Sequence, residues 1–342
     1  MHAGSRSLAV RHAAARWLRR LLNAALALLL AWEVLAIGYF PLLPAPARWP
    51  VAAAVGLFCV WGLWRSRQRW PRWVVGALFG VSWLAWAGIA PSLERDWRPE
   101  VAVMPRIAVD GDRVHISGYR HFEYRSASDF TPRYEERTVR LSQLRSVDFL
   151  LSYWQQGPVA HTFASFNFDD AAPVSISIET RPEVGEGFDP LASLFKHFEL
   201  IYVVGDERDL VRVRTNYRQE DVFLYRTNLS RDAAQRLFLI YAERINELAV
   251  RPEFYHLLSN SCTINIVRYA NRIGRVGPLD IRHVLNGLSD RYLYRAGVVD
   301  TSLPFDTLRA RSHINAAARA ADQAADFSER IRQDLPVPGP LR

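Results

Sequence analysis

Hydrophobic residues are unevenly distributed along the chain, and three apolar runs fill its first hundred residues. The runs cover residues 21–40, 49–64 and 73–93. A helix needs about 20 predominantly apolar residues to cross a bilayer, and the second run is shorter than that. Several tryptophans stand at the ends of the runs, as they do at membrane interfaces. We predict a membrane portion at residues 1–96 with three transmembrane helices; a buried hairpin of core helices is the alternative.

Beyond residue 97 the apolar residues alternate over short stretches, which is typical of half-buried β-strands. The alternation predicts strands at residues 113–119, 136–144, 147–153, 200–204, 211–214 and 221–225. Helical spacing predicts a long amphipathic helix at 231–250 and further helices at 191–198, 280–288 and 315–335. This mixed order predicts one α+β domain over residues 97–335, with a loose tail at 336–342.

Two further alternating segments are joined by a short polar turn at Asp169 and Asp170. Residues 161–168 and 174–180 therefore predict a β-hairpin. If the turn closes this hairpin, His161 and Glu179 lie opposite or diagonal to each other on its polar face. A carboxylate beside an imidazole fixes its tautomer and raises its basicity, as an orienting group does in nucleophilic catalysis. Two other interpretations remain open: Glu179 pairs with Arg181, and His161 is a solvated strand residue.

Cys262 is the only cysteine beyond the apolar runs, and it follows the polar turn at residues 259–261. Apolar residues then recur at helical spacing up to Gly274, a helix-ending residue. We therefore expect Cys262 in the first turn of a helix. Free N–H groups and the helix dipole favour thiolate over thiol there, and the thiolate is the nucleophile. The simpler interpretation is a small buried hydrophobic residue.

The composition of the chain argues against a disulfide-rich, a nucleic-acid-binding and a metal-dependent protein. The chain has 342 residues, 49% of them hydrophobic, which suits a membrane portion followed by one domain. Its two cysteines lie in different regions, so no disulfide framework is expected. The formal charge of +8 comes from arginines that often flank the apolar runs, and no nucleic-acid-binding motif accompanies them. The cysteine and histidine positions show no zinc-like spacing, so no metal, organic cofactor or nucleic-acid partner is expected.

The arginine positions predict the orientation in the membrane. Arginines crowd the segment before the first run and the loop between the second and third runs, whereas Arg48 stands alone in the first loop. The positive-inside rule then places the N-terminus and the second loop in the cytoplasm. With three spans the domain lies outside, in the periplasm of a Gram-negative cell, and the protein is a multi-pass protein of the inner membrane. The small residues at 44–47 resemble a signal-peptide cleavage site, but the first run is long for a signal peptide, so an uncleaved helix is preferred.

The predicted hairpin and the Cys262 turn carry sequence patterns that occur together in a known family. His161 opens a strand of the form His-Thr-Phe-x-Ser-Phe, an Ile-Ser-Ile-Glu strand ends at Glu179, and a Tyr-x-Leu-Leu-x-Asn-x-Cys-Thr turn runs from Tyr255 into a helix. In this combination the chain resembles, over about residues 147–274, the domain of the Lnb-type bacterial lipoprotein N-acyltransferases. That domain is similar to circularly permuted papain-like folds, so the resemblance implies a permuted papain-like, NlpC-like thiol fold.

The resemblance implies acyl transfer through a thioester on Cys262. His161 would take the thiol proton and Glu179 would orient His161. Asn260 or the backbone N–H of Cys262 would hold the oxyanion, a role usually worth about 3 kcal/mol per donor, and Ser177 and Tyr255 would support the site. The acyl chain would come from a membrane lipid or a diacylglyceryl lipoprotein and pass to the N-terminal amine of a lipoprotein.

Two other functions remain open. Permuted papain-like folds also include hydrolases, so a cell-wall amidase or peptidase with the same thioester chemistry is one alternative. A non-enzymatic membrane sensor, in which Cys262 serves packing only, is the other. The apolar runs favour membrane lipids and lipoproteins as partners over peptidoglycan.

Overall fold

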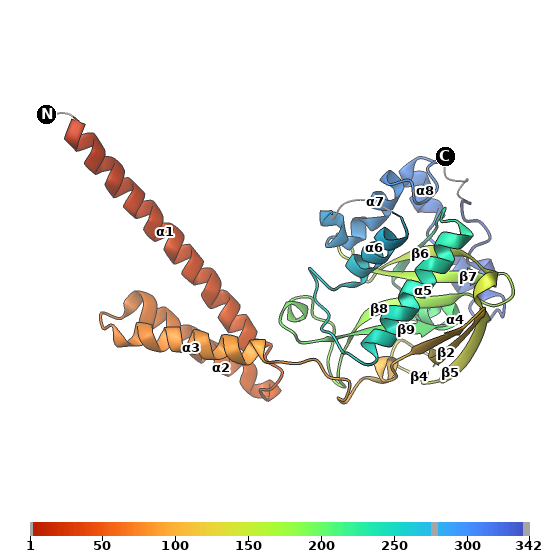
Figure 1. Ribbon diagram of the computed structural model, residues 1–342, viewed down its shortest axis with the longest axis horizontal. Coiled ribbons are helices and arrows are strands. Elements are labelled where there is room, and N and C mark those ends of the chain that lie inside the picture. Colours follow the sequence, from red (N-terminus) through yellow and green to blue (C-terminus); the bar gives the residue numbers. More distant parts are fainter. Residues whose placement is uncertain (1–2, 275–279, 338–342) are drawn as a thin grey trace. The chain divides into compact units, whose positions relative to one another are not determined.

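A computed structural model describes residues 3–274 and 280–337 and divides the chain into two units (Figure 1). The first unit contains Met1–Ala90 together with Leu194–His197, and the second contains Pro91–Ser193 and Phe198–Arg342. From residue 338 on, the predicted tail lies outside the described residues. Each unit is described by itself below.

The first unit is helical. It consists of α1 (Ala3–Gly38), α2 (Ala45–Val60), a π-helical extension of α2 (Trp61–Arg65) and α3 (Trp70–Ala87). Among the described helices, two are long and apolar enough to cross a membrane, at His12–Gly38 and Ala45–Arg65. The second helix is longer than the apolar run at 49–64, because it begins earlier, at Ala45, and ends at Arg65.

The prediction of a third membrane span is wrong. The run at residues 73–93 forms α3, but α3 has only 18 residues and is not one of the two candidate spans. It begins with Trp70, Pro71 and Arg72, and it contains further tryptophans and two glycines, which contribute little to hydropathy. The helical unit thus has two candidate spans, not three.

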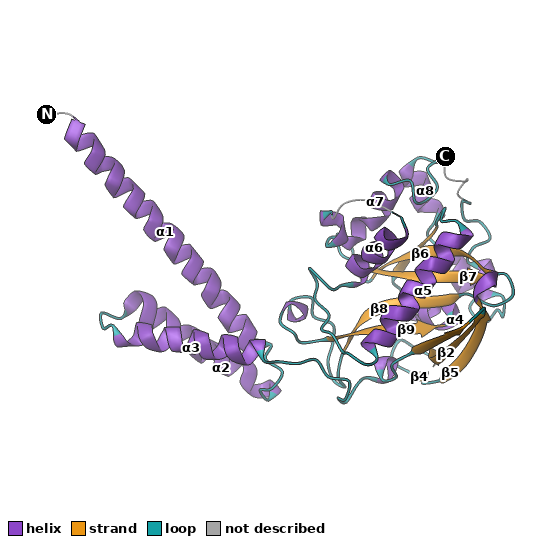
Figure 2. Cartoon of the chain, in the orientation of Figure 1, coloured by secondary structure: helices purple, strands orange, loops and turns teal. Residues whose placement is uncertain are grey.

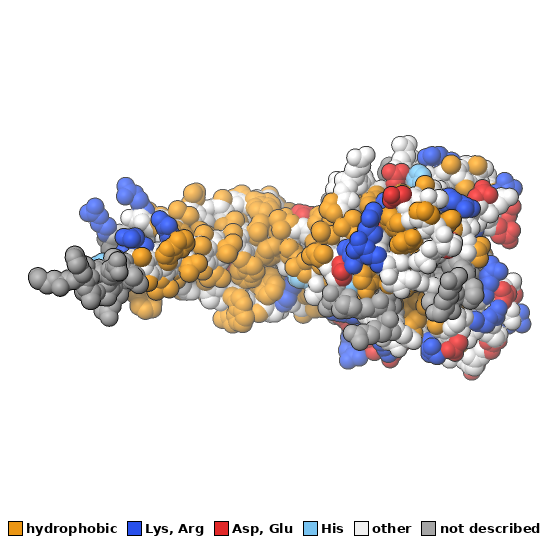
Figure 3. Space-filling view, turned by 90° about the horizontal axis from the view of Figure 1, so that it is seen from above, with side chains coloured by type: hydrophobic (Ala, Val, Ile, Leu, Met, Phe, Trp, Pro, Cys, Tyr) orange, Lys and Arg blue, Asp and Glu red, His pale blue; other side chains and the backbone are white. Residues whose placement is uncertain are grey.

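Exposed apolar side chains characterise the surface of the helical unit. Leu21, Leu28 and Leu57 are 64%, 74% and 73% exposed. In the space-filling view, hydrophobic side chains cover most of this unit, whereas the surface of the α+β unit mixes basic, acidic and apolar side chains (Figure 3). Such a surface suits contact with lipid tails better than contact with water.

The second unit is built on a mixed sheet (Figure 2). Its strands are β1 (Arg106–Asp110), β2 (Arg113–Arg120), β5 (Tyr134–Arg140), β6 (Leu144–Tyr153), β7 (His161–Phe168), β8 (Val174–Arg181), β9 (Glu199–Gly205) and β10 (Asp221–Arg226). The spatial order is β1-β2-β9-β8-β7-β6-β10, with β5 paired to β2. All pairs are antiparallel except β2–β9. A separate small ribbon joins β3 (Glu123–Tyr124) to β4 (Phe130–Thr131).

Helices follow or cover this sheet. They are α4 (Glu207–Leu210), a π-helical turn (Val213–Tyr217), α5 (Arg231–Leu248), α6 (Cys262–Ile273), α7 (Ser289–Arg295), α8 (Phe305–Arg311), α9 (Asn315–Ala320) and α10 (Phe327–Arg330). Short 3-10 turns occur at Pro99–Val101, Leu141–Gln143, Ala192–Leu194, Ile281–His283 and Asn286–Leu288. The mixed α+β class is therefore confirmed.

Apolar side chains on both faces of the sheet form the core. On one face Phe166 meets Phe238 and Tyr241 of α5 edge to face. On the other face Leu150 and Phe163 are buried with residues of α9 and α10. Burial of both faces explains why β7 is buried over nearly its whole length, so that its polar residues are enclosed with the apolar ones.

Several predicted elements differ in the structure. The alternation at residues 211–214 leads into a π-helical turn instead of a strand, because Asp206 caps α4 by accepting a hydrogen bond from the N–H of Arg208 and the chain continues helically. The helix predicted at 191–198 is only a 3-10 turn at Ala192–Leu194. The helices predicted at 280–288 and 315–335 are each broken into shorter pieces.

Candidate active site

The sulfur of Cys262 lies at the beginning of a helix and inside the domain. Cys262 is the first residue of α6, directly after the N-cap Ser261, and it is only 2% exposed. The first N–H groups of a helix have no partner within it, so they and the helix dipole stabilise negative charge at this end. The structure therefore places Cys262 where the sequence predicted it.

A polar side chain from a distant segment reaches the Cys262 sulfur. The side-chain nitrogen of Asn286 donates to the sulfur at 3.6 Å. Burial alone raises the pKa of the Cys262 thiol, but the hydrogen bond and charge of His161, together with hydrogen bonds from Thr162, outweigh burial and lower it to about 6. A thiol with this pKa is largely thiolate at neutral pH, which makes it a strong nucleophile.

His161 and Glu179 meet on neighbouring strands. The β7–β8 register pairs Phe163 with Ser177, so two residues further along His161 stands across from Glu179. Nε2 of His161 lies 2.6 Å from the Ser177 hydroxyl and 3.8 Å from Oε1 of Glu179. Because Nε2 is occupied by these partners, Nδ1 is left as the nitrogen for the thiol proton.

An arginine that the sequence did not point to fixes Glu179. Arg214 donates to Oε1 of Glu179 at 2.8 Å, and its guanidinium lies over the Phe163 ring. Burial raises the pKa of Glu179, but Arg214 and then His161 lower it far more, so the carboxyl stays ionised. The expectation that Glu179 pairs with Arg181 is wrong, because Arg181 donates to the carbonyls of Val101 and Ala102 instead.

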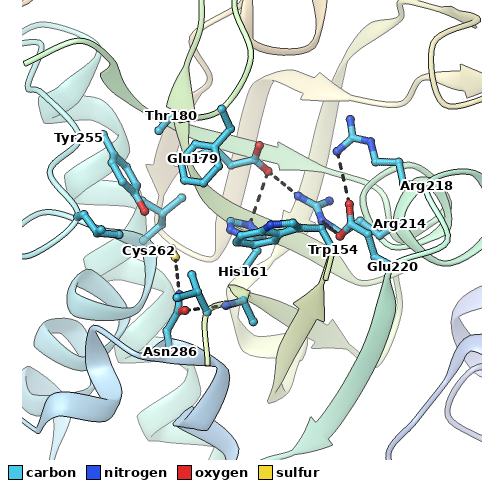
Figure 4. A pocket seen from close by; sticks show the side chains of 15 residues that line it. Trp154, His161, Glu179, Thr180, Arg214, Arg218, Glu220, Tyr255, Cys262 and Asn286 are labelled. Carbon is cyan, nitrogen blue, oxygen red and sulfur yellow. Dashed lines mark hydrogen bonds and ion pairs between the residues drawn. The ribbon is translucent and has the colours of Figure 1, made fainter. Parts of the chain in front are cut away.

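These residues open into one cavity of about 330 Å³ (Figure 4). Cys262, His161 and Glu179 lie on its wall together with Asn286 and Tyr255. Apolar side chains form much of the remaining wall: Trp154, Val159, Ile178, Phe188 and Leu257. The cavity thus combines a nucleophile and its polar partners with space for an apolar group.

Of the three other residues expected at the site, Ser177 and Tyr255 lie there and Asn260 does not. Ser177 hydrogen-bonds His161 as stated, and Tyr255 lies on the cavity wall near Cys262, where burial and the neighbouring sulfur raise its pKa well above the usual value. Asn260 is a correction. Its side-chain nitrogen donates to Glu253 and to the Phe254 carbonyl, and its oxygen accepts from Asn265. The side chain therefore stabilises the turn before the helix and is not directed at the sulfur.

Asn286 occupies the place that Asn260 was expected to take. Its side-chain oxygen accepts a hydrogen bond from the N–H of Ala160, next to His161, while its nitrogen faces the sulfur. The following Gly287 donates its N–H to the Pro158 carbonyl and accepts a hydrogen bond from the Tyr153 hydroxyl. The Asn-Gly pair was readable as a turn signal, but nothing in the sequence indicated that this turn reaches Cys262.

Gly287 has no side chain, which lets the Asn286–Gly287 turn pack closely on Pro158, and this gives a testable prediction. A Cβ on Gly287 would lie 2.8 Å from the Pro158 carbonyl carbon, so Gly287→Ala must push the Asn286 turn away from the strand. A displacement of this kind is expected to lower kcat/KM on an activated ester about tenfold. Gly187→Ala is the matched control, because a Cβ there has no neighbour within 4 Å. Equal rates in the two variants would contradict the role assigned to the turn.

The lowered pKa of Cys262 predicts how its reactivity depends on pH. In a Cys59→Ala background, alkylation by iodoacetamide should follow the thiolate and reach half its maximal rate near pH 6, whereas an ordinary thiol would do so near 9. His161→Ala removes the hydrogen bond and charge that lower the pKa, so it should move the midpoint upward. A wild-type midpoint above pH 8 would contradict the Cys262–His161 interaction.

Among the residues that the structure describes, no group of three or more histidine, cysteine, aspartate or glutamate side chains is arranged to hold a metal ion.

Residues 130–295 match the family described as the Lnb N-terminal periplasmic domain. This segment includes every residue of the candidate site described above. No curated protein and no solved structure matches the chain.

Proposed function

We propose that this chain, whose residues 130–295 belong to the Lnb N-terminal periplasmic domain family, is a membrane-anchored thiol acyltransferase. The observation that carries the proposal is one cavity that holds a thiol at the start of a helix together with a histidine and the carboxylate beside that histidine. Cys262 and His161 line the same cavity, His161 lowers the pKa of the Cys262 thiol, and His161 lies beside Glu179. Nucleophile, base and orienting group in this sequence of contacts are the parts of a covalent acyl-transfer site.

In the first half-reaction, the Cys262 sulfur attacks the carbonyl carbon of an acyl ester while its proton resides on His161. The carbonyl oxygen becomes an oxyanion, for which the donors are the side-chain nitrogen of Asn286, 3.6 Å from the sulfur, and the first N–H groups of α6. His161 then gives the proton to the departing alcohol, and the acyl group remains on Cys262 as a thioester. Glu179 stabilises the imidazolium throughout.

In the second half-reaction, an amine attacks the thioester carbonyl. His161 takes a proton from the amine, the Cys262 sulfur leaves, and an amide is formed. We propose the N-terminal amine of a lipoprotein as the acceptor and a membrane lipid or diacylglyceryl lipoprotein as the donor. Water is the competing acceptor, and a cell-wall amidase or peptidase would use it in the same way.

The apolar lining of the cavity supports an acyl substrate. Its wall is rich in aromatic and aliphatic side chains, among them Trp154, Phe188 and Ile178. Burial of each methylene of an acyl chain stabilises the complex by about 0.8 kcal/mol, so such a wall favours long chains over peptidoglycan. Incubation of the purified full chain with a diacyl lipopeptide should give an N-acylated product; release of a free fatty acid alone would identify a hydrolase.

The two candidate spans change the argument about location. Two crossings return the chain to the side on which it began, so the arginine pattern no longer places the domain outside. We propose the periplasmic side because the matched family is a periplasmic domain. Alkaline phosphatase fused after Arg342 should then be active in Gram-negative cells; an inactive fusion of normal abundance would contradict this location.

The proposed fold relationship also goes beyond the α+β class. A thiol at the start of a helix, preceded in the chain by a histidine on a strand, is the arrangement expected of a permuted papain-like domain. His161 on β7 and Cys262 on α6 have this order. An experimental structure of the full chain, compared over residues 97–335 with papain-like folds, would test the relationship; a different strand order around His161 and Cys262 would contradict it.

A further inference from the structure

Exposed apolar side chains occur in the wall of the Cys262 cavity and in the segments next to it. Trp154 and Phe188 line the cavity and are still 40% and 46% exposed. Leu258, next to the lining residue Leu257, is 54% exposed, and Leu191, which follows Phe188 closely in the chain, is 42% exposed. We call Trp154, Phe188, Leu191 and Leu258 the apolar rim.

The apolar rim differs from scattered exposed residues, which are common on soluble proteins. Its members come from three separate segments: the end of β6, the loop before β9 and the turn before α6. Trp154 and Phe188 meet edge to face, with ring centroids 5.9 Å apart. Two members of the rim, Trp154 and Phe188, are therefore also part of the apolar wall of the cavity that contains Cys262.

We propose that the apolar rim docks on the surface of a lipid bilayer, so that an acyl chain passes from the bilayer into the cavity without crossing water. This inference rests on the proposed acyl transfer. In the described part of the chain, two helices are apolar enough to cross a membrane, and through them the domain would be tethered beside lipid. Leu191 stands three residues before Leu194, where the chain enters the helical unit.

The chemistry of the rim selects lipid as its occupant. Tryptophan and phenylalanine are side chains that insert at the boundary between headgroups and acyl chains. No member of the rim is charged, so docking depends on apolar contact and should not weaken when the salt concentration rises. An electrostatic partner, such as an acidic protein, would show the opposite salt dependence.

A direct test measures the depth of Leu258 in the membrane. In a Cys59→Ala, Cys262→Ala background, Leu258→Cys is labelled with a fluorophore and the full chain is reconstituted in phosphatidylcholine nanodiscs. Lipids with a quencher in the upper acyl chain should quench this label several-fold more than one at Val109→Cys, an exposed position on β1 at the edge of the sheet. Equal quenching at the two positions would overturn the proposal.

A second test separates docking from catalysis. Leu191→Ser with Leu258→Ser alters the rim outside the cavity wall, and Val109→Ser with Val250→Ser is a control of similarly exposed residues. The rim variant should turn over a long-chain ester in nanodiscs about tenfold more slowly than the control, with an unchanged burst on soluble p-nitrophenyl acetate. Equal nanodisc rates would overturn the docking proposal, whereas a wild-type chain without any burst would instead contradict the acyl-transfer chemistry. If the rim variant itself shows no burst, its active site is damaged and its nanodisc rate does not report docking. The quenching of the label at Leu258→Cys then decides the proposal.

Discussion

Replacement of Cys262 by alanine is expected to abolish N-acylation of a diacyl lipopeptide. The rate should fall by about 10³-fold or more, because no other group can form the covalent intermediate and only binding and oxyanion stabilisation remain. Cys262 is buried and close in size to alanine, so the melting temperature should change little. Mass spectrometry of the lipopeptide measures the product, and circular dichroism measures folding.

Cys59→Ala is the matched control for this experiment. Cys59 is the other cysteine of the chain; it is buried among apolar side chains of the helical unit and is not one of the residues that line the cavity. This variant should retain the wild-type rate. Acyl transfer that survives in folded Cys262→Ala would exclude a thioester and, with it, both the transferase and the thiol hydrolase.

Substitution of Glu179 by glutamine is expected to have the second largest effect, a loss of about 10²-fold in kcat/KM. Glutamine keeps the shape of the side chain but removes the negative charge that stabilises the His161 imidazolium. The Cys262 thiol then loses part of the charge that lowers its pKa, so the alkylation midpoint should rise above the wild-type value of about 6. Steady-state kinetics and the alkylation profile measure the two effects separately.

Stability must be followed in the same variant. Arg214 is nearly buried and donates to Glu179, so the loss of its partner charge also destabilises the fold. Arg214→Gln is the comparison, because it breaks the same ion pair and leaves the Glu179 carboxylate beside His161. If Glu179→Gln lowered the melting temperature as Arg214→Gln does but left the midpoint in place, Glu179 would be structural and not an orienting residue.

Much of the site was readable from local sequence patterns. The alternation in residues 161–168 and 174–180 predicted the hairpin, and the short polar turn between them predicted a register close to the observed pairing of Phe163 with Ser177. The helical spacing after Cys262 likewise predicted α6 and its start. Both inferences depend only on side-chain periodicity, which the backbone imposes locally.

Contacts between distant segments were not readable in this way. Asn286 reaches Cys262 only because the turn at Gly287 packs on Pro158, and no periodicity reports such packing. Arg214 alternates with valines and so indicated a strand, but its buried ion pair with Glu179 requires the helical path that Asp206 begins. Asn260 was misassigned because proximity in sequence to Cys262 does not determine where its amide points.

The number of membrane spans was misjudged for a related reason. The run at residues 73–93 is apolar in character, but tryptophan, proline and glycine make up much of it, and its helix ends at Ala87. Length and hydropathy of the folded helix decide whether a segment can span a bilayer. Both quantities depend on where the helix begins and ends, which composition does not give.

The most direct test of the account is the intact mass of the full chain after reaction with an acyl donor in the absence of any amine acceptor. The account predicts a gain of one acyl chain, located on Cys262 by peptide mapping, removed by neutral hydroxylamine and transferred when a lipopeptide amine is added. Efficient acylation of the lipopeptide by a protein that never carries an acyl group on Cys262 would contradict it.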